Sequence, residues 1–563
     1  MAQTLAAGLA CLSLALPYFD YNRYPLSASE SLALIFFLTF LWAAAACLFN
    51  LVRLGPVFFA VLVFFYADTT SGLGFRDSVF WPVKLVALQF QDPQLLFFSP
   101  VFFAEAWLLQ LLKGRTAVLF ASYVLALAPL CLLAMGWRKV LSSFFSDASR
   151  WVKPAGLILL ILASSALIGL VFNPAKPLFD QTLSDLSQTV PAPKDNALIL
   201  ILDEHLGVQA FPEDLPRSAQ LKDYLRSFYP QKNFTLYPRA YSNYYNTQRS
   251  LPSLFNYEPA ENTPDYWRRG NRLLRGYHDK GYRLFIYQTD YLPICSTLQG
   301  RYFQCVEYNK NSTGFLHNSL WPPLQKTLVL FSAFIESGRS TLAKKILWVM
   351  SEKISWLPWG HVEPVGGIRI FDRIQADMQR YPKGSVFFAH LLLPHSPYLY
   401  DSACQLKATT KWDHRLITRF APESTWETKH ENYADQTRCT HLKIEQLLTY
   451  MKDLGIYDLS TILIFGDHGS RIYSRLPESS QSSNEWTADN SSDRDILELF
   501  SAFLAVKVPG QTSGQIIENK TASAEVIART AGLIRPGEEQ ESLRKIYFQG
   551  RGGSMTAREM IDF

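Results

Sequence analysis

Side chains able to do chemistry are concentrated in the stretch Ser460–Arg471 (STILIFGDHGSR), where Asp467 and His468 follow an apolar, β-branched run. The run Thr461–Phe465 is typical of a buried strand, and glycines on both sides of the Asp-His pair let the backbone turn. A carboxylate and an imidazole side by side at a strand end are candidate ligands of a metal ion. The alternative is a surface Asp-His pair at an ordinary strand–loop junction.

Three further stretches carry residues of matching type. LILDEH supplies the carboxylates of Asp203 and Glu204, and YYNTQRSLPSLF supplies the Thr247 hydroxyl. HLLLPHSPY supplies the imidazoles of His390 and His395. A threonine hydroxyl is a poor nucleophile at neutral pH, but coordination to Zn²⁺ lowers its pKa and activates it. Carboxylates with an imidazole suit zinc, whereas carboxylates alone would favour Mn²⁺ or Mg²⁺.

A helix predicted to start at Ser250-Leu251-Pro252 would offer free N–H groups to a phosphate held on Thr247. His395, between two prolines, would protonate a leaving oxygen or bind the phosphoryl group. Each residue also has an ordinary interpretation, because carboxylates can cap a turn and His390 can be a satisfied core histidine. We interpret four other histidines as structural: His205, His414, His430 and His441.

These motifs follow predicted elements of an α/β sandwich domain. Strands are predicted at 197–202, 282–287, 385–393 and 461–465, with an edge strand at 500–508. Helices are predicted between them at 265–280, 368–380 and 433–454. Alternating strands and helices imply a mostly parallel central sheet, whose carboxyl edge gathers the chemistry. One fold can therefore bring the separate motifs together.

The first 174 residues are instead dominated by apolar runs, which predict an α-helical membrane domain of about five spans. The spans are placed at 2–19, 31–52, 56–69, 116–137 and 154–172. Basic residues cluster between the fourth and fifth spans, so the positive-inside rule puts the catalytic half outside the cytoplasm. Counting 95–112 as a sixth span would put that half in the cytoplasm, and the first run could be a signal peptide.

The net charge and the cysteines narrow the possible classes of function further. The net charge of the 563 residues is only +5, and no basic tract with interleaved aromatics indicates nucleic acid. Cysteines 295, 305, 404 and 439 lie in the second half and allow three disulfide connectivities. We predict the pairs closest in sequence, Cys295–Cys305 and Cys404–Cys439; four free thiols in a cytosolic domain are the alternative.

Taken together, the motifs resemble the sulfatase-like branch of the alkaline phosphatase superfamily over most of residues 197–510. The overall architecture resembles membrane-anchored phosphoethanolamine transferases and lipoteichoic acid synthases. In the transferases the nucleophilic threonine stands three residues before a Ser-hydrophobic-Pro tripeptide, which implies that Thr247 is the nucleophile. The resemblance also implies a metal site, which we expect to bind zinc, or else Mn²⁺ or Mg²⁺. Its ligands would be Glu204, Thr247, Asp467 and His468, with Asp203 as a further one.

The resemblance is partial in two places. The transferases have another histidine beyond Asp-His-Gly, and this chain has none after His468. Arg471 or Arg494 would take that place. True sulfatases use a C/S-x-P-x-R motif, and Ser250 begins a match that fails at Leu254, where the arginine is required. The substrate-binding candidates are His390, His395, Arg471 and Asn243.

The sequence thus predicts a membrane domain (1–174), a linker (175–194), a periplasmic catalytic domain (195–545) and a loosely ordered tail (546–563). The resemblance implies a monomeric, multi-pass enzyme of the bacterial inner membrane. It would transfer a phosphoethanolamine or phosphoglycerol headgroup from a phospholipid to lipid A, lipopolysaccharide or another envelope glycan. A hydrolase of the same substrates and a non-catalytic lipid- or lipopolysaccharide-binding regulator are the alternatives.

Overall fold

The computed structural model describes most of the chain from residue 195 onward. The described residues are 19, 28–36, 38, 40, the backbone of 180–182, 195–259, 267, 270–308, 323–337, 362–408, 411–412, 426–472, 491–532, 541–549 and 555–563. The chain divides into two compact units, residues 1–175 with 316–360, and residues 176–315 with 361–563. One internal segment of the predicted domain 195–545, residues 316–360, therefore belongs to the first unit.

The first unit is described only in part. It contains α13 (Pro323–Ser337), whose Lys326 amine lies 3.8 Å from the Glu30 carboxylate. The five predicted spans fall almost entirely outside the described residues. Among the residues that are described, none of the helices combines the length and hydropathy needed to cross a bilayer. The membrane domain stays a prediction.

The second unit is built around a sheet in which nine strands are described, in the order β1-β6-β5-β7-β2-β8-β9-β3-β10. Neighbouring strands from β6 to β8 run parallel. They are β6 (Gln304–Tyr308), β5 (Arg283–Thr289), β7 (Ser385–Leu391), β2 (Ala197–Leu202) and β8 (Thr461–Gly466). The flanking strands β1 (Asp180–Thr182), β9 (Leu504–Lys507) and β3 (Thr235–Leu236) add antiparallel pairs at both sides. Beyond them, β10 (Gln515–Ile516) pairs with β3 in parallel.

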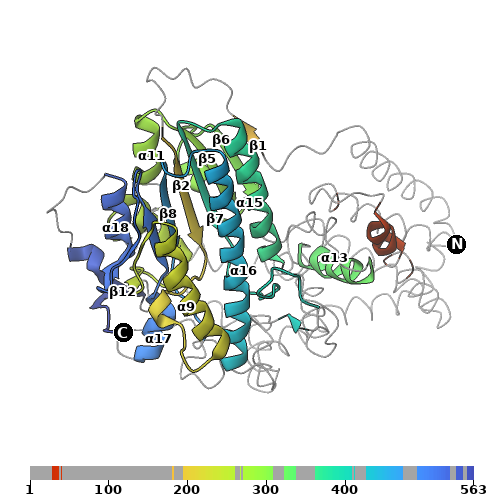
Figure 1. The fold of residues 1–563 in the computed structure, drawn as a ribbon. Helices are drawn as coiled ribbons and strands as arrows, with labels where there is room; N and C mark the ends of the chain where they lie inside the picture. Colours follow the sequence, from red (N-terminus) through yellow and green to blue (C-terminus); the bar gives the residue numbers. More distant parts are fainter. Residues whose placement is uncertain are drawn as a thin grey trace, which may run out of the picture. The chain divides into compact units, whose positions relative to one another are not determined.

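Helices cover both faces of this sheet (Figure 1). On one face lie α9 (Pro216–Gln231), α15 (Glu363–Arg380) and α16 (Trp426–Asp453). On the other lie α10 (Thr247–Asn256), α11 (Arg272–Asp279) and α18 (Ser523–Thr530). We call the two hydrophobic cores beneath them the first core and the second core. Alternate residues of β2 enter each core, which is why this strand is apolar throughout.

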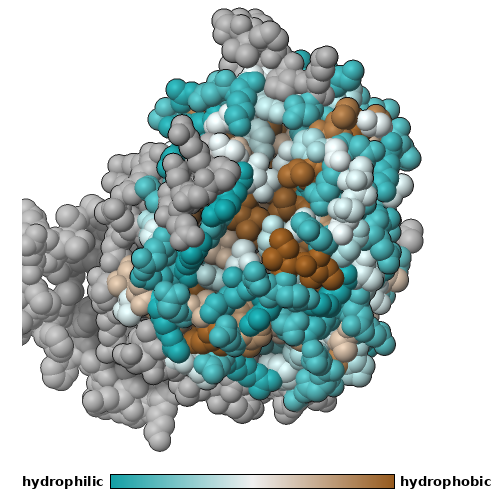
Figure 2. Space-filling view, turned by 60° about the vertical axis from the view of Figure 1, so that its left-hand side comes forward, coloured by the Kyte–Doolittle hydropathy of each residue, from teal (hydrophilic) through white to brown (hydrophobic). Residues whose placement is uncertain are grey.

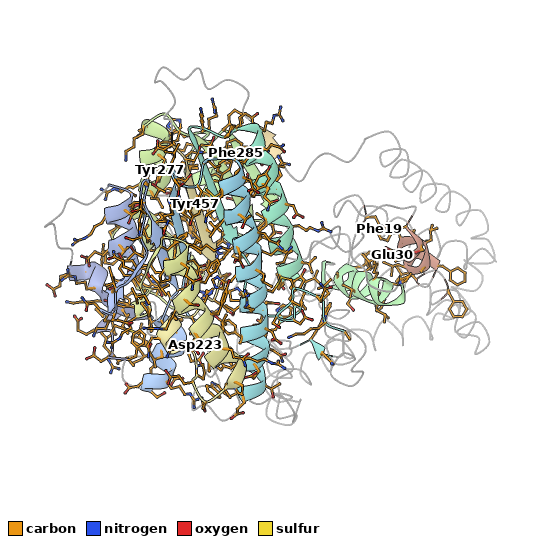
Figure 3. The ribbon with its side chains drawn as sticks, in the orientation of Figure 1. Phe19, Glu30, Asp223, Tyr277, Phe285 and Tyr457 are labelled. Atoms are coloured by element: carbon orange, nitrogen blue, oxygen red, sulfur yellow. A yellow bond between two sulfur atoms is a disulfide. The ribbon has the colours of Figure 1, made fainter. Side chains whose placement is uncertain are left out.

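The cores are rich in aromatic side chains, and Figure 3 labels Phe285 of the first core and Tyr277 of the second. On the face shown in Figure 2, hydrophilic side chains surround a few separate hydrophobic areas. Beyond residue 194, the described large hydrophobic side chains with the highest exposed fractions are Leu459 (54%), Val508 (42%) and Ile516 (36%). The described surface of this unit is therefore mainly polar.

Most of the predicted elements are present, with shifted ends. The strand predicted at 500–508 is β9, but it is not at the edge, because β3 and β10 lie beyond it. The predicted linker contributes β1. The predicted loosely ordered tail contains a hairpin of β12 (Lys545–Gln549) and β13 (Met555–Glu559), whose Phe548 is buried in a small cluster with Phe500. Both predicted disulfides are confirmed, Cys295–Cys305 and Cys404–Cys439.

Candidate active site

The register of three parallel strands brings the main motifs to one edge of the sheet. Leu202 at the end of β2 pairs with Leu391 of β7 on one side and with Gly466 of β8 on the other. Residues that follow these strand ends therefore lie side by side. The side chains that enter the second core are the odd-numbered ones in β2 and β8 and the even-numbered ones in β7. Continuing this alternation directs Asp203, His390 and Asp467 toward the same face, the one that α10 covers.

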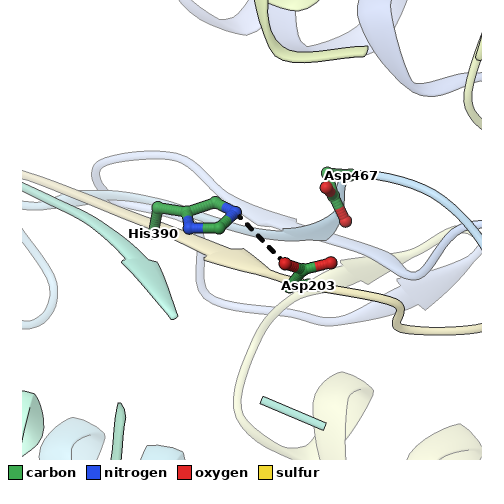
Figure 4. Close-up of side chains that lie close together, drawn as sticks. All are labelled: Asp203, His390 and Asp467. Atoms are coloured by element: carbon green, nitrogen blue, oxygen red, sulfur yellow. Dashed lines mark ion pairs between the residues drawn. The ribbon is translucent and has the colours of Figure 1, made fainter. Parts of the chain in front are cut away.

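Asp203, His390 and Asp467 form a buried cluster with donor atoms within 4.8 Å of one another (Figure 4). His390 Nε2 lies 3.8 Å from Asp203 Oδ2. Among the described residues, neither ring nitrogen of His390 has a hydrogen-bond partner. The interpretation of His390 as a satisfied core histidine therefore does not hold. Burial, with a smaller effect of nearby His395, lowers the pKa of His390 to about 3, so its imidazole is neutral.

His468 turns one ring nitrogen toward these carboxylates. Its Nδ1 lies 2.9 Å from the Gly469 carbonyl, which can only accept, so Nδ1 carries the proton and Nε2 keeps a lone pair. Nε2 lies 3.6 Å from Asp203 Oδ1 and 3.5 Å from Asp467 Oδ2. Burial is the largest cause that holds the pKa of His468 well below its usual value. A neutral imidazole with its lone pair facing carboxylates is the arrangement of a metal ligand.

Thr247, at the start of α10, adds a hydroxyl group to this cluster. Its Oγ1 lies 3.2 Å from His468 Nε2. α10 begins at Thr247 itself, three residues before the predicted start, because the Asn246 side chain caps the helix by accepting from Arg249 N. The hydroxyl of Ser250 donates to the carbonyl of Asp467 instead. Thr247, not Ser250, therefore presents a hydroxyl to the carboxylates.

Glu204 lies beside this cluster in a different set of contacts. Its carboxylate forms an ion pair with Arg471 and lies 3.6 Å from His395 Nε2. Its backbone N–H donates to Asp467 Oδ1 at 3.1 Å. Asp203, Glu204 and His395 form a second group of donor atoms within 4.8 Å of one another. Asp203 belongs to both groups, although the family resemblance gave it only an auxiliary part.

The residues present fit a divalent cation. The buried donors combine carboxylate oxygens with imidazole nitrogens, a set that suits zinc and also manganese. His390 offers two buried nitrogens that have no hydrogen-bond partner in the described part of the chain. Burial raises the pKa of Asp467 to about 7, and a bound cation would favour its charged form. The residues that would hold the ion are Asp203, Glu204, Thr247, His390, Asp467 and His468.

Other candidates have structural contacts. Asn243 donates its side-chain amide to the carbonyls of Leu543 and Lys545, and a role in substrate binding stays a prediction. Arg494 stacks on Trp426, with its Cζ 3.9 Å from the ring centroid. His205 and His441 are hydrogen-bonded to each other and His430 to Glu498. His414 lies outside the described residues.

Several residues around the site were not predicted as site residues from the sequence. Tyr433 and Gln436 on α16 bond the backbone of the loops that bear Glu204 and His395. Glu498 on α17 (Asp493–Phe500) accepts hydrogen bonds from Ser470 and Ile472, next to Arg471. Each of them lies at least 26 residues from the loop that it contacts. Only the polar character of some positions in otherwise apolar helix faces could have indicated them.

A mostly parallel sheet with helices on both faces, and with the candidate site residues at its carboxyl edge, makes this unit an α/β sandwich. The family model described as "Sulfatase" matches residues 196–494, more than half of the chain. The chain belongs to the sulfatase family. A comparison with curated proteins found no match.

Three of the solved structures that are similar to this chain have sequence identities of 11% or 12%. Lipoteichoic acid synthase LtaP from Listeria monocytogenes is 12% identical, covers 65% of this chain and 81% of its own, and has a TM-score of 0.39. The periplasmic domain of EptC from Escherichia coli with zinc is 11% identical, with coverages of 68% and 96% and a TM-score of 0.39. The membrane protein EptA, a lipooligosaccharide phosphoethanolamine transferase from Neisseria meningitidis, is 11% identical, with coverages of 94% and 94% and a TM-score of 0.36.

Proposed function

We propose that the protein is a metal-dependent transferase that moves a phosphoethanolamine or phosphoglycerol headgroup from a phospholipid to lipid A, lipopolysaccharide or another envelope glycan. The observation that carries this proposal is the position of Thr247. Its hydroxyl lies 3.2 Å from His468 Nε2, at the sheet edge where Asp203 and Asp467 meet. The sequence motifs that resemble phosphoethanolamine transferases supply the chemical class of the substrate.

The protein environment favours a phosphoryl group on Thr247. As the first residue of α10, Thr247 stands at the helix end where backbone N–H groups lack intrahelical partners, which favours an anion. A divalent cation, when bound by the carboxylates and His468, would lower the pKa of the threonine hydroxyl and balance phosphoryl charge. Arg471, also at this edge, supplies a fixed positive charge that is paired with Glu204.

The transfer takes two displacements at phosphorus. In the first, a bond forms from Thr247 Oγ1 to phosphorus and the bond from phosphorus to the glycerol oxygen of the lipid breaks. The net proton moves from the threonine hydroxyl to the departing oxygen, so diacylglycerol leaves as an alcohol. In the second, an acceptor hydroxyl attacks the same phosphorus, the bond to Thr247 breaks, and the hydroxyl proton returns to the threonine.

His395 is suited to deliver the proton to the departing oxygen. Its Nδ1 is hydrogen-bonded to the Ser396 carbonyl, which leaves Nε2 to exchange a proton. The side chain keeps an exposed fraction of 15%, whereas His390 and His468 are fully buried. Of the three imidazoles, only that of His395 combines contact with the site and access to substrate.

The proposed setting is the outer side of a bacterial inner membrane, with the enzyme acting as a monomer anchored by its first 174 residues. A membrane anchor suits this chemistry because the donor lies in the bilayer. The product diacylglycerol then remains in the membrane after it leaves the active site.

The test uses membranes that contain the full-length chain and headgroup-labelled phosphatidylethanolamine or phosphatidylglycerol. We expect label on a glycolipid, and an adduct of headgroup mass on a peptide that contains Thr247. Thr247→Ala should abolish both, while Ser253→Ala, which removes a buried hydroxyl almost two turns further along α10, should keep them. Transfer unaffected by Thr247→Ala would refute the mechanism. Release of free headgroup alone would indicate a hydrolase, and failure to bind zinc would indicate a non-catalytic protein.

A further inference from the structure

One face of α16 contacts two of the three loops that carry the candidate site and reaches the third through Glu498. His430, Tyr433 and Gln436 lie three residues apart, on adjacent turns of the helix, and all three side chains are fully buried. α16 packs on the first core, whereas Asp203, His390 and Asp467 point toward the second. The helix therefore reaches the loops from the side of the sheet opposite Thr247.

Gln436 makes the largest set of these contacts. Its Oε1 accepts from the backbone N–H groups of Leu399 at 2.7 Å and of Tyr400 at 3.3 Å. Its Nε2 donates to three carbonyls of the same loop, those of Pro394 (3.1 Å), His395 (2.8 Å) and Pro397 (3.2 Å). The partners fix the orientation of the amide, because carbonyls only accept and N–H groups only donate. One side chain thus holds the backbone on both sides of His395.

The imidazole of His395 is fixed to the loop in turn. Its Nδ1 is hydrogen-bonded to the carbonyl of Ser396, the next residue. The loop is also packed from α15, where a Cβ on Gly367 would lie 3.1 Å from the Leu393 side chain. The position of His395 Nε2, 3.6 Å from Glu204, is therefore set by a chain of contacts that ends at Gln436.

The other two residues of the face act on the other two loops. The Tyr433 hydroxyl donates to the Glu204 carbonyl at 2.9 Å and accepts from Leu206 N at 2.8 Å. It therefore spans the turn that carries Glu204. His430 Nε2 lies 2.6 Å from the carboxylate of Glu498, which also accepts from the Ser470 hydroxyl and from Ile472 N at 3.2 Å.

We propose that Gln436 is a positioning residue that holds His395 in place for proton delivery, as part of a face of α16 that aligns the three loops. The role of His395 rests on the proposed function, whereas the alignment of the loop by Gln436 does not. A glutamine buried only for packing would leave its amide to water or to its own helix. This amide instead bonds five backbone groups of one loop.

The first test is kinetic and uses the full-length chain in membranes. Gln436→Glu keeps the shape and an accepting oxygen but places a second oxygen against three carbonyls. We expect kcat for headgroup transfer to fall about 100-fold, the size of effect of a displacement of about 1 Å, with KM and bound metal little changed. The control is Thr440→Val, since the Thr440 hydroxyl is also fully buried but, among the residues that the structure describes, bonds only the Gln436 carbonyl within the helix. It should keep kcat.

A double-mutant cycle separates positioning from general damage. If Gln436 acts through His395, Gln436→Glu should slow His395→Ala less than about threefold, although it slows the wild type about 100-fold. A full and additive loss in the His395→Ala background would overturn the proposal. So would an equal loss of kcat in Thr440→Val.

Amide hydrogen exchange supplies a readout that does not depend on activity. Gln436→Leu can neither accept from the N–H groups nor donate to the carbonyls of the loop. In this variant, exchange of the segment 394–400 should rise at least about tenfold while peptides of α15 and β2 stay protected. Unchanged exchange of this segment would also overturn the proposal. If exchange rises but the wild type shows no headgroup transfer, the positioning of the loop stands and the proposed function fails. If transfer occurs but no variant of His395 affects it, the proposed role of Gln436 in proton delivery is overturned.

Discussion

The Arg471 guanidinium forms an ion pair with the Glu204 carboxylate, and both residues have a left-handed backbone, with φ of +57° and +64°. Residues other than glycine adopt this region at a cost and keep it where the surroundings impose it. Here the Glu204 turn is spanned by Tyr433, and Arg471 N donates to the Glu498 carbonyl. The two turns are therefore built to bring a buried charge pair together beside the metal-ligand candidates.

Removal of the guanidinium from this pair should destabilise the metal-free protein and make the stability of the variant depend on bound metal. Arg471→Met removes the guanidinium from the fully buried carboxylate of Glu204, which costs about 3 kcal/mol or more of unfolding free energy. Added zinc should then raise the melting temperature of the variant more than that of the wild type, because a cation can replace the guanidinium. The control Arg369→Met removes an exposed pair with Asp372 and should cost less than about 1 kcal/mol. An equal zinc response in variant and wild type would contradict this prediction.

Gly469 should not tolerate even a methyl group. A Cβ at this position would lie 2.3 Å from the backbone oxygen of Glu498, which cannot move without breaking its bond to Arg471 N. Gly469→Ala should therefore displace His468 and lower both metal affinity and melting temperature. In the control Gly455→Ala no atom lies within 4 Å of the new Cβ, and only the φ of +67° is unfavourable, at about 1 kcal/mol. Equal metal affinity of Gly469→Ala and the wild type would argue against the predicted role of the close contact.

The sequence predicts the strands that carry the site because their surroundings leave a clear pattern. β2 and β8 are covered on both faces, so they are continuous apolar runs that end at the first polar site residue. The sequence does not predict β6, whose short run QCVEY includes the polar Gln304 and Glu307, or α9, whose Pro216 and Pro230 indicate breaks. Pro216 stands in the first turn of α9, where proline is tolerated, and Pro230 in the last.

The site is predictable in its residue types but not in its pairings. Strand ends place Asp203, His395 and Asp467 at one edge without any knowledge of contacts. Which carboxylate faces His468 depends on the Glu204 turn, whose φ of +64° is imposed by Tyr433 from 229 residues away. Such long-range contacts leave no local pattern. For the same reason Glu498, in the ordinary helical stretch DRDILELF, gives no sign of its contacts.

The two disulfides should contribute unequally to stability. Cys404–Cys439 closes a separation of 35 residues and ties the segment that follows the His395 loop to α16, whereas Cys295–Cys305 closes only 10. Loop-closure entropy predicts a loss of about 4 kcal/mol for the first and about 3 kcal/mol for the second when each pair is replaced by alanines. Chemical denaturation of the two double variants measures the difference. A larger loss for the 295–305 pair would show that native contacts, not chain entropy, dominate.

His390 should make the metal-free protein sensitive to acid. Burial lowers its pKa in the folded state to about 3, below the ordinary value of 6.5. The unfolded chain therefore binds a proton that the folded chain does not, between these two values. The stability from this group is complete above pH 6.5 and is lost as the pH falls toward 3, by up to about 1.4 kcal/mol per pH unit. In the presence of a chelator, His390→Gln should unfold with a weaker pH dependence between pH 6.5 and 4. An identical slope in both proteins would contradict the prediction.

The contribution of the two neighbouring carboxylates to metal binding should be unequal, in an order that the structure sets. Asp203 belongs to both donor groups and lies 3.6 Å from His468 Nε2, whereas Glu204 is already paired with Arg471. Asp203→Asn should therefore weaken zinc binding more than Glu204→Gln. We expect a loss of at least about tenfold for Asp203→Asn, since even the partners of metal ligands contribute this much. Zinc titration of the chelator-treated full-length chain measures both affinities, with His278→Gln on α11 as a control outside the site. The opposite order would mean that metal binding separates Glu204 from Arg471 and makes Glu204 the main ligand, as the family resemblance implies.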